Sequence, residues 1–148
     1  MNLKMEKNKT EIIKLLKHKQ GICSRLLEKM GEQMKAVETQ DESGLGAIIE
    51  GKEELIVGLN ETDKKIADLA GELDSNIIES LGREHEGLIQ DIESDLEKII
   101  EQEKICHEKL SLVKSEVLEK IKAVKKGQAL LKGYGVSKRT KPNISKNV

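Results

Sequence analysis

The sequence predicts an all-α fold: an antiparallel bundle, or coiled coil, of three long helices that ends in a flexible basic tail. Apolar residues recur every three or four positions over most of the chain, which is the period of an amphipathic helix. The chain has one Tyr and no Phe or Trp, and it shows neither strand alternation nor βαβ patterning. Apolar and charged residues each make up 36% of it, which suits slender helices with a narrow buried seam. Its 148 residues predict a bundle domain over 1–132 and a tail over 133–148.

The first helix is predicted over residues 10–39, with Thr10 as a candidate cap. Its apolar stripe comprises Ile12, Ile13, Leu15, Leu16, Ile22, Cys23, Leu26, Leu27, Met30, Met34 and Val37. Gly21 and Gly31 weaken the helix locally, because glycine has a poor helix propensity. A turn is expected around residues 40–44, where turn-forming residues break the pattern.

The second helix is predicted over residues 43–73 from a further apolar stripe. That stripe comprises Leu45, Ile48, Ile49, Leu55, Ile56, Leu59, Ile66, Leu69, Ala70 and Leu73. The end of this helix stays open. Residues 74–76 have the composition of a break followed by a new cap, but the apolar spacing continues beyond them, so the helix also fits a turn at 82–87.

The third helix is predicted to reach about Leu131 as one unbroken rod, since residues 88–126 contain no Gly, Pro or aromatic residue. Residues 88–126 alone would span roughly 58 Å at the helical rise. A helix longer than its two companions would leave apolar residues uncovered near its end, and these would bind another helix. The predicted partner-contact residues are Val113, Val117, Leu118, Ile121, Val124, Leu131 and Tyr134.

Charge is segregated along the chain although the net charge is only −1. Residues 1–35 carry +5, residues 36–78 carry −8, residues 79–119 carry −7 and residues 120–148 carry +9. A basic first helix between acidic ones favours an antiparallel hairpin over mispaired alternatives. The basic tail has no periodic apolar face, so we expect it to be disordered when free. Because stacking aromatics are missing and two blocks are acidic, we expect no nucleic-acid partner.

The remaining site chemistry predicts no enzyme, no metal and no cofactor. The three histidines lie one per long segment, and Cys106 and His107 are neighbours that point in different directions on a helix. The carboxylates lie on solvated helix faces, without a phosphate-binding loop or a nucleophile motif. Cys23 and Cys106 fall on apolar stripes and are expected to be reduced core thiols. With no secretory signal and no apolar run of transmembrane length, we expect a cytoplasmic protein without membrane insertion.

Two stretches resemble the FlgN/FliT class of bacterial flagellar export chaperones. Residues 41–45, DESGL, followed by residues 48–56, IIEGKEELI, resemble the start of that family's second helix. Residues 130–135, LLKGYG, followed by a short basic tail, resemble its C-terminal end. The paired asparagines that many members carry in the last helix are absent, which leaves the subfamily and its client open.

The resemblance implies a cytoplasmic chaperone for late axial proteins, either hook–filament junction proteins or a filament-cap protein. It implies that the chain keeps a client's amphipathic terminal helix from aggregating and escorts it to the flagellar type III export apparatus. A groove along residues 113–131 would bind such a helix. The alternative is a structural coiled-coil protein that self-associates, for example as a homodimer, and has no client.

Overall fold

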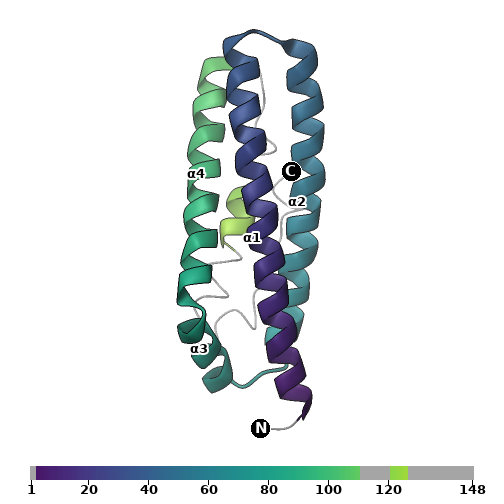
Figure 1. Cartoon of the computed structure of the whole chain (residues 1–148), viewed down its shortest axis with the longest axis vertical. Helices are drawn as coiled ribbons and strands as arrows, with labels where there is room; N and C mark the ends of the chain where they lie inside the picture. Colours follow the sequence, from purple (N-terminus) through teal and green to yellow (C-terminus); the bar gives the residue numbers. More distant parts are fainter. Residues whose placement is uncertain (1–2, 111–120, 127–148) are drawn as a thin grey trace.

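The computed structural model describes residues 3–110 and 121–126, and every element in this part of the chain is a helix. The elements are α1 (Leu3–Glu38), α2 (Glu42–Ala70), α3 (Ser75–Glu84) and α4 (Glu86–Leu110), with a further helical segment at residues 121–126. The all-α prediction is therefore confirmed. The α1 and α2 helices run side by side in opposite directions, α4 packs along α1, and α3 lies at the end of the bundle where α2 stops (Figure 1). The predicted tail, residues 133–148, lies outside the described residues.

The first helix begins earlier than predicted. Thr10 was expected to cap it, but the helix already begins at Leu3 and Thr10 lies inside it. A contact with the turn after α2 accompanies these extra helical turns: Asn8 Nδ2 donates a hydrogen bond to Glu72 Oε2 at 2.8 Å. A local capping signal could not predict this start, because the partner is distant in sequence.

The predicted turn around residues 40–44 is confirmed and lies between α1 and α2. Gln40 adopts a left-handed backbone with φ of 57°, as is usual for the residue that ends a helix by reversing it. The backbone N–H of Asp41 then donates to the Ala36 carbonyl at 2.9 Å. The Asp41 side chain caps α2 by accepting a hydrogen bond from Gly44 N at 2.9 Å, so one aspartate closes the first helix and opens the second.

Replacing Gly31 with Ala should raise the free energy of unfolding by about 0.5–1 kcal/mol. An added Cβ at Gly31 meets no atom within 4 Å, so only the gain in helix propensity remains. Urea denaturation followed by circular dichroism measures this change. Gly44→Ala is the matched control and should destabilise the protein, because its Cβ would overlap the carboxylate of Asp41. Equal effects of the two substitutions would contradict this assignment.

The open boundary after the second helix is resolved by two interruptions of the helical path. The α2 helix ends at Ala70, and the N–H of Gly71 donates to the Ala67 carbonyl at 2.9 Å. The short α3 helix then follows Asp74 and ends at Glu84, and His85 separates it from α4. The helical path is therefore interrupted near both positions that the sequence offered, residues 74–76 and residues 82–87.

The prediction of one unbroken third rod is wrong. The Lys125 Nζ atom lies 2.9 Å from Glu97 Oε1, although the two residues are 28 positions apart. A straight helix would separate them by roughly 42 Å. The chain must therefore fold back between α4 and residues 121–126, which lie within the bundle in Figure 1. Burial of this segment explains the difference, because folding back covers apolar side chains that a rod would leave in water.

Candidate interaction site

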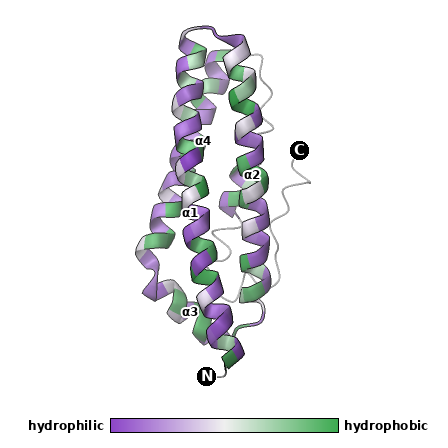
Figure 2. Ribbon diagram, turned by 45° about the vertical axis from the view of Figure 1, so that its right-hand side comes forward, coloured by the Kyte–Doolittle hydropathy of each residue, from purple (hydrophilic) through white to green (hydrophobic). Residues whose placement is uncertain are grey.

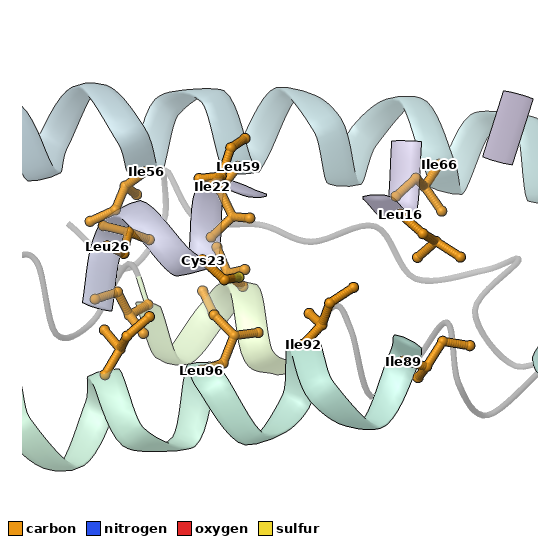
Figure 3. Close-up of a cluster of buried hydrophobic side chains, with 14 of the residues drawn as sticks. Leu16, Ile22, Cys23, Leu26, Ile56, Leu59, Ile66, Ile89, Ile92 and Leu96 are labelled. Carbon is orange, nitrogen blue, oxygen red and sulfur yellow. The ribbon is translucent and has the colours of Figure 1, made fainter. Parts of the chain in front are cut away.

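The core is an aliphatic seam shared by the three long helices. Figure 2 shows hydrophobic and hydrophilic residues alternating along every helix, as the periodicity predicted. In Figure 3 the side chains of α1 lie between those of α2 and those of α4. The labelled residues are Leu16, Ile22, Cys23 and Leu26 from α1, Ile56, Leu59 and Ile66 from α2, and Ile89, Ile92 and Leu96 from α4. The folded-back segment completes this core.

Two of the predicted partner-contact residues belong to that core. Ile121 and Val124 are each 0% exposed and pack in the same cluster as the long helices. The expectation that they lie partly uncovered on a protruding helix is therefore wrong. Its physical reason is the reversal of the chain, which turns the apolar stripe of residues 121–126 inward. The other five predicted contact residues, Val113, Val117, Leu118, Leu131 and Tyr134, lie outside the described residues.

Apolar burial, more than charge, holds the folded-back segment. Ile121, Ala123 and Val124 are all buried, and complete burial of an Ile or Val side chain contributes about 1.5–3 kcal/mol. The ion pair between Lys125 and Glu97 joins side chains that are 35% and 54% exposed. Exposed pairs of this kind contribute little, because water and salt screen them. The bundle thus accepts a short amphipathic helix mainly through its aliphatic face.

A buried polar cluster joins all three long helices, and we call it the three-helix polar layer. It consists of Gln33 from α1, Lys52 from α2 and Glu103 from α4, which are 2%, 0% and 7% exposed. The Lys52 ammonium donates to Gln33 Oε1 at 2.6 Å and to Glu103 Oε2. The Gln33 amide donates to Glu103 Oε1 at 3.1 Å, which closes the ring of contacts. Burial lowers the pKa of Lys52, and the Glu103 carboxylate opposes that shift.

A second buried pair, the two-helix polar layer, joins α1 to α2. The Lys19 Nζ atom lies 2.6 Å from Asp63 Oδ1, and both side chains are almost fully buried. Burial raises the pKa of Asp63, while the neighbouring Lys19 ammonium acts in the opposite direction. Asp63 Oδ2 and the nearby Asn60 Oδ1 are buried without a hydrogen-bond partner. This layer thus joins the two helices through one carboxylate oxygen.

Neither layer was singled out from the sequence, although a signal for both was present. The seam of α1 proceeds by steps of three and four residues, and Lys19 and Gln33 occupy two of its positions. Lys52 and Asp63 occupy seam positions of α2 in the same way, and Glu103 does so on α4. Charged residues of opposite sign at seam positions of different helices predict buried pairs. A search for apolar residues alone passes over them.

Both cysteines lie in the core as free thiols, as expected for their stripe positions. Burial raises the pKa of Cys23 to about 12 and also raises that of Cys106. The Cys106 thiol lies 3.0 Å from the Met34 thioether. Both thiols are therefore protonated near neutral pH, and the reactive thiolate form is suppressed.

The described residues carry few features of a chemical site. Among residues 3–110 and 121–126, no three His, Cys, Asp or Glu side chains are grouped so that they could hold a metal ion. In the same part of the chain, no helix is both long and apolar enough to cross a bilayer. The aliphatic face and the two polar layers are the features that remain for a function to use. No family model, curated protein or solved structure matches this chain.

Proposed function

We propose that this protein is a cytoplasmic helix-binding chaperone of the FlgN/FliT flagellar export class. Its client is the amphipathic terminal helix of a late axial protein of the hook–filament junction or filament-cap type. The chaperone prevents that helix from aggregating and delivers it to the type III export apparatus. The client class rests on the resemblance of residues 41–56 and 130–135 to that family. The binding mode rests on one observation, the seating of residues 121–126 in the bundle.

The seated segment supports helix-in-groove binding. Its contact with the bundle consists of three buried aliphatic side chains and one exposed ion pair. The bundle thus holds an amphipathic helix by its apolar spacing, and we propose the same mode of contact for the client helix. Val113, Val117 and Leu118 continue the spacing of Ile121 and Val124 in the sequence. We therefore propose that the stretch before residue 121 contributes the client contacts, while Ile121 and Val124 remain core residues.

The affinity of this site is expected to be moderate. A client helix that is unfolded in isolation must be ordered on binding, and that cost offsets part of the apolar burial. Among the described residues, the core seam also lacks the Trp and Tyr side chains that dominate tight interfaces, because it is built mainly from Ile and Leu. A binder of this kind suits a client that must later be released to an export channel.

Val117→Asp should abolish client binding and leave the helix content nearly unchanged. The substitution places a charge in the proposed apolar contact, where it cannot be buried without a partner. The measurement is fluorescence anisotropy with labelled terminal-helix peptides of hook–filament junction and filament-cap proteins, together with circular dichroism. Ser115→Asp, which lies off the apolar stripe, is the matched control and should bind normally. Unfolding of the Val117 variant would instead assign that residue to the internal core.

The competing interpretation is self-association without a client. The same purified protein and peptides distinguish it from the chaperone function. Light scattering on the purified chain gives its mass, and co-purification from a flagellated host identifies what it binds. A stable dimer that binds none of the terminal-helix peptides would support a structural coiled-coil protein. Retrieval of an axial protein from the host, lost in Val117→Asp and kept in Ser115→Asp, would support the chaperone.

A further inference from the structure

We propose that the three-helix and two-helix polar layers act as an alignment device. They fix which helices pair and in which register, so that the helices do not slide along one another or pair out of register. This inference concerns the bundle itself and holds whether or not the protein carries a client. It rests on five buried side chains: Lys19, Gln33, Lys52, Asp63 and Glu103.

Stability alone does not account for these residues. All five occupy seam positions at which aliphatic side chains would pack, and all are 7% exposed or less. Removing two opposite charges from water costs nearly as much as their attraction returns, so a well-packed aliphatic layer is often at least as stable. Polar residues at single seam positions do have a well-attested effect on helical assemblies, namely the selection of register and partner.

The need for such selection follows from the rest of the seam. In the described part of the chain, the core cluster consists mostly of Ile and Leu, with a few Met, Cys, Ala and Val residues. It contains no aromatic side chain. Aliphatic seams of this kind repeat with the heptad, so a shift by seven residues brings apolar positions into contact again. Without further information, the helices would pair in several registers of similar energy.

The two-helix layer penalises a shift of α2 along α1. Because the two helices run in opposite directions (Figure 1), a shift by one heptad would place Ile56 or Ala70 opposite Lys19. Asp63 would then face an aliphatic side chain of α1. Both charges would be left buried without a partner, which is among the most unfavourable arrangements in a protein core.

The three-helix layer penalises displacement of α4 as well. A heptad shift of α4 would bring Leu96 or Leu110 to the place of Glu103, opposite the Lys52 ammonium. Gln33 would lose its acceptor on α4 in the same step. Because this layer joins α1, α2 and α4, and the other joins α1 to α2, each of the three long helices is accepted only in the native alignment.

The decisive variant replaces both layers with apolar side chains: Lys19→Met, Gln33→Leu, Lys52→Met, Asp63→Leu and Glu103→Met. We expect it to stay helical and to resist urea at least as well as the parent protein. We also expect it to populate several arrangements of the helices, where the parent protein has one. Light scattering after gel filtration should show additional masses, and the ¹H–¹⁵N spectrum should show more peaks than residues or broad exchanging peaks.

Two further variants make the result specific. Exchanging the charges in place, with Lys19→Asp and Asp63→Lys together with Lys52→Glu and Glu103→Lys, keeps both layers and should retain the single species of the parent. Replacing only the three-helix layer, with Gln33→Leu, Lys52→Met and Glu103→Met, should keep α1 and α2 in register and release only α4. Peak multiplicity should then be confined to α4 and its contacts.

The proposal is overturned by either of two outcomes. If the variant without polar layers remains a single species with one set of peaks, the layers do not specify alignment. If it loses its helix content, and the three-helix-layer variant does too, the layers are needed for stability itself. Multiplicity in the apolar variants combined with a single species in the charge-exchanged one supports the alignment device.

Discussion

Replacing Lys52 with Met should lower the free energy of unfolding by about 3–5 kcal/mol, the usual cost of removing one partner of a buried ion pair. The Lys52 ammonium is 0% exposed and donates to both Gln33 and Glu103. Without it, the Glu103 carboxylate keeps only the Gln33 amide as a donor, in a site that water barely reaches. Urea denaturation followed by circular dichroism measures the loss.

Adding Glu103→Met to Lys52→Met should recover most of the lost stability, because the uncompensated buried carboxylate disappears. The double-mutant cycle then gives the coupling between the two side chains. Lys98→Met is the matched control on α4, since Lys98 is exposed, and its effect should stay within about 0.5 kcal/mol. Glu103→Met alone completes the cycle, and a loss in the double variant equal to the sum of the two single losses would show that the two side chains are not coupled.

Val124→Asp should lower the free energy of unfolding by about 2–4 kcal/mol, through lost apolar burial and the desolvation of a carboxylate. Val124 is 0% exposed in the folded-back segment. The expected result is detachment of residues 121–126, which hydrogen exchange would detect as lost protection along the facing seam of α4. The physical reason is that a charge cannot stay in the aliphatic core without a partner.

Val57→Asp provides the comparison for this experiment. Val57 is a valine on the outer side of α2 and is 53% exposed, so the same substitution there should change stability by no more than about 0.5 kcal/mol. Equal losses at the two positions would mean that residues 121–126 do not close the core. A loss confined to Val124 is the result expected if residues 121–126 pack in the core.

The presence of the long helices could be predicted from the sequence, because the spacing of apolar residues is a local property. The turn at residues 39–41 was also predictable, since Asp41 and Gly44 carry the chemistry of a cap. The start of α1 at Leu3 was not, because Asn8 contacts Glu72 in the turn after α2, which is distant in sequence. Periodicity shows which face of a helix is buried. It does not show where the helix begins or ends when contacts with other elements stabilise its terminal turns.

The course of the chain after α4 was mispredicted for a related reason. Residues 88–126 contain no Gly or Pro to mark a reversal, and the apolar spacing continues through them. Tertiary burial decides the path of the chain, because Ile121 and Val124 become buried in the core of the bundle when the segment folds back. The polar layers were missed because charged residues are usually solvated, whereas Lys19 and Lys52 each find a buried carboxylate on another helix.

The return of residues 121–126 also bears on how the protein is made. Synthesis proceeds from the N-terminus, and early segments can pair as soon as they emerge from the ribosome. Here Ile121, Ala123 and Val124, the last core residues in the described part of the chain, are translated after α1 to α4. A nascent chain interrupted after Leu110 would therefore expose the apolar core surface that residues 121–126 later cover. Holdase chaperones or proteases would bind this surface before that segment is synthesised.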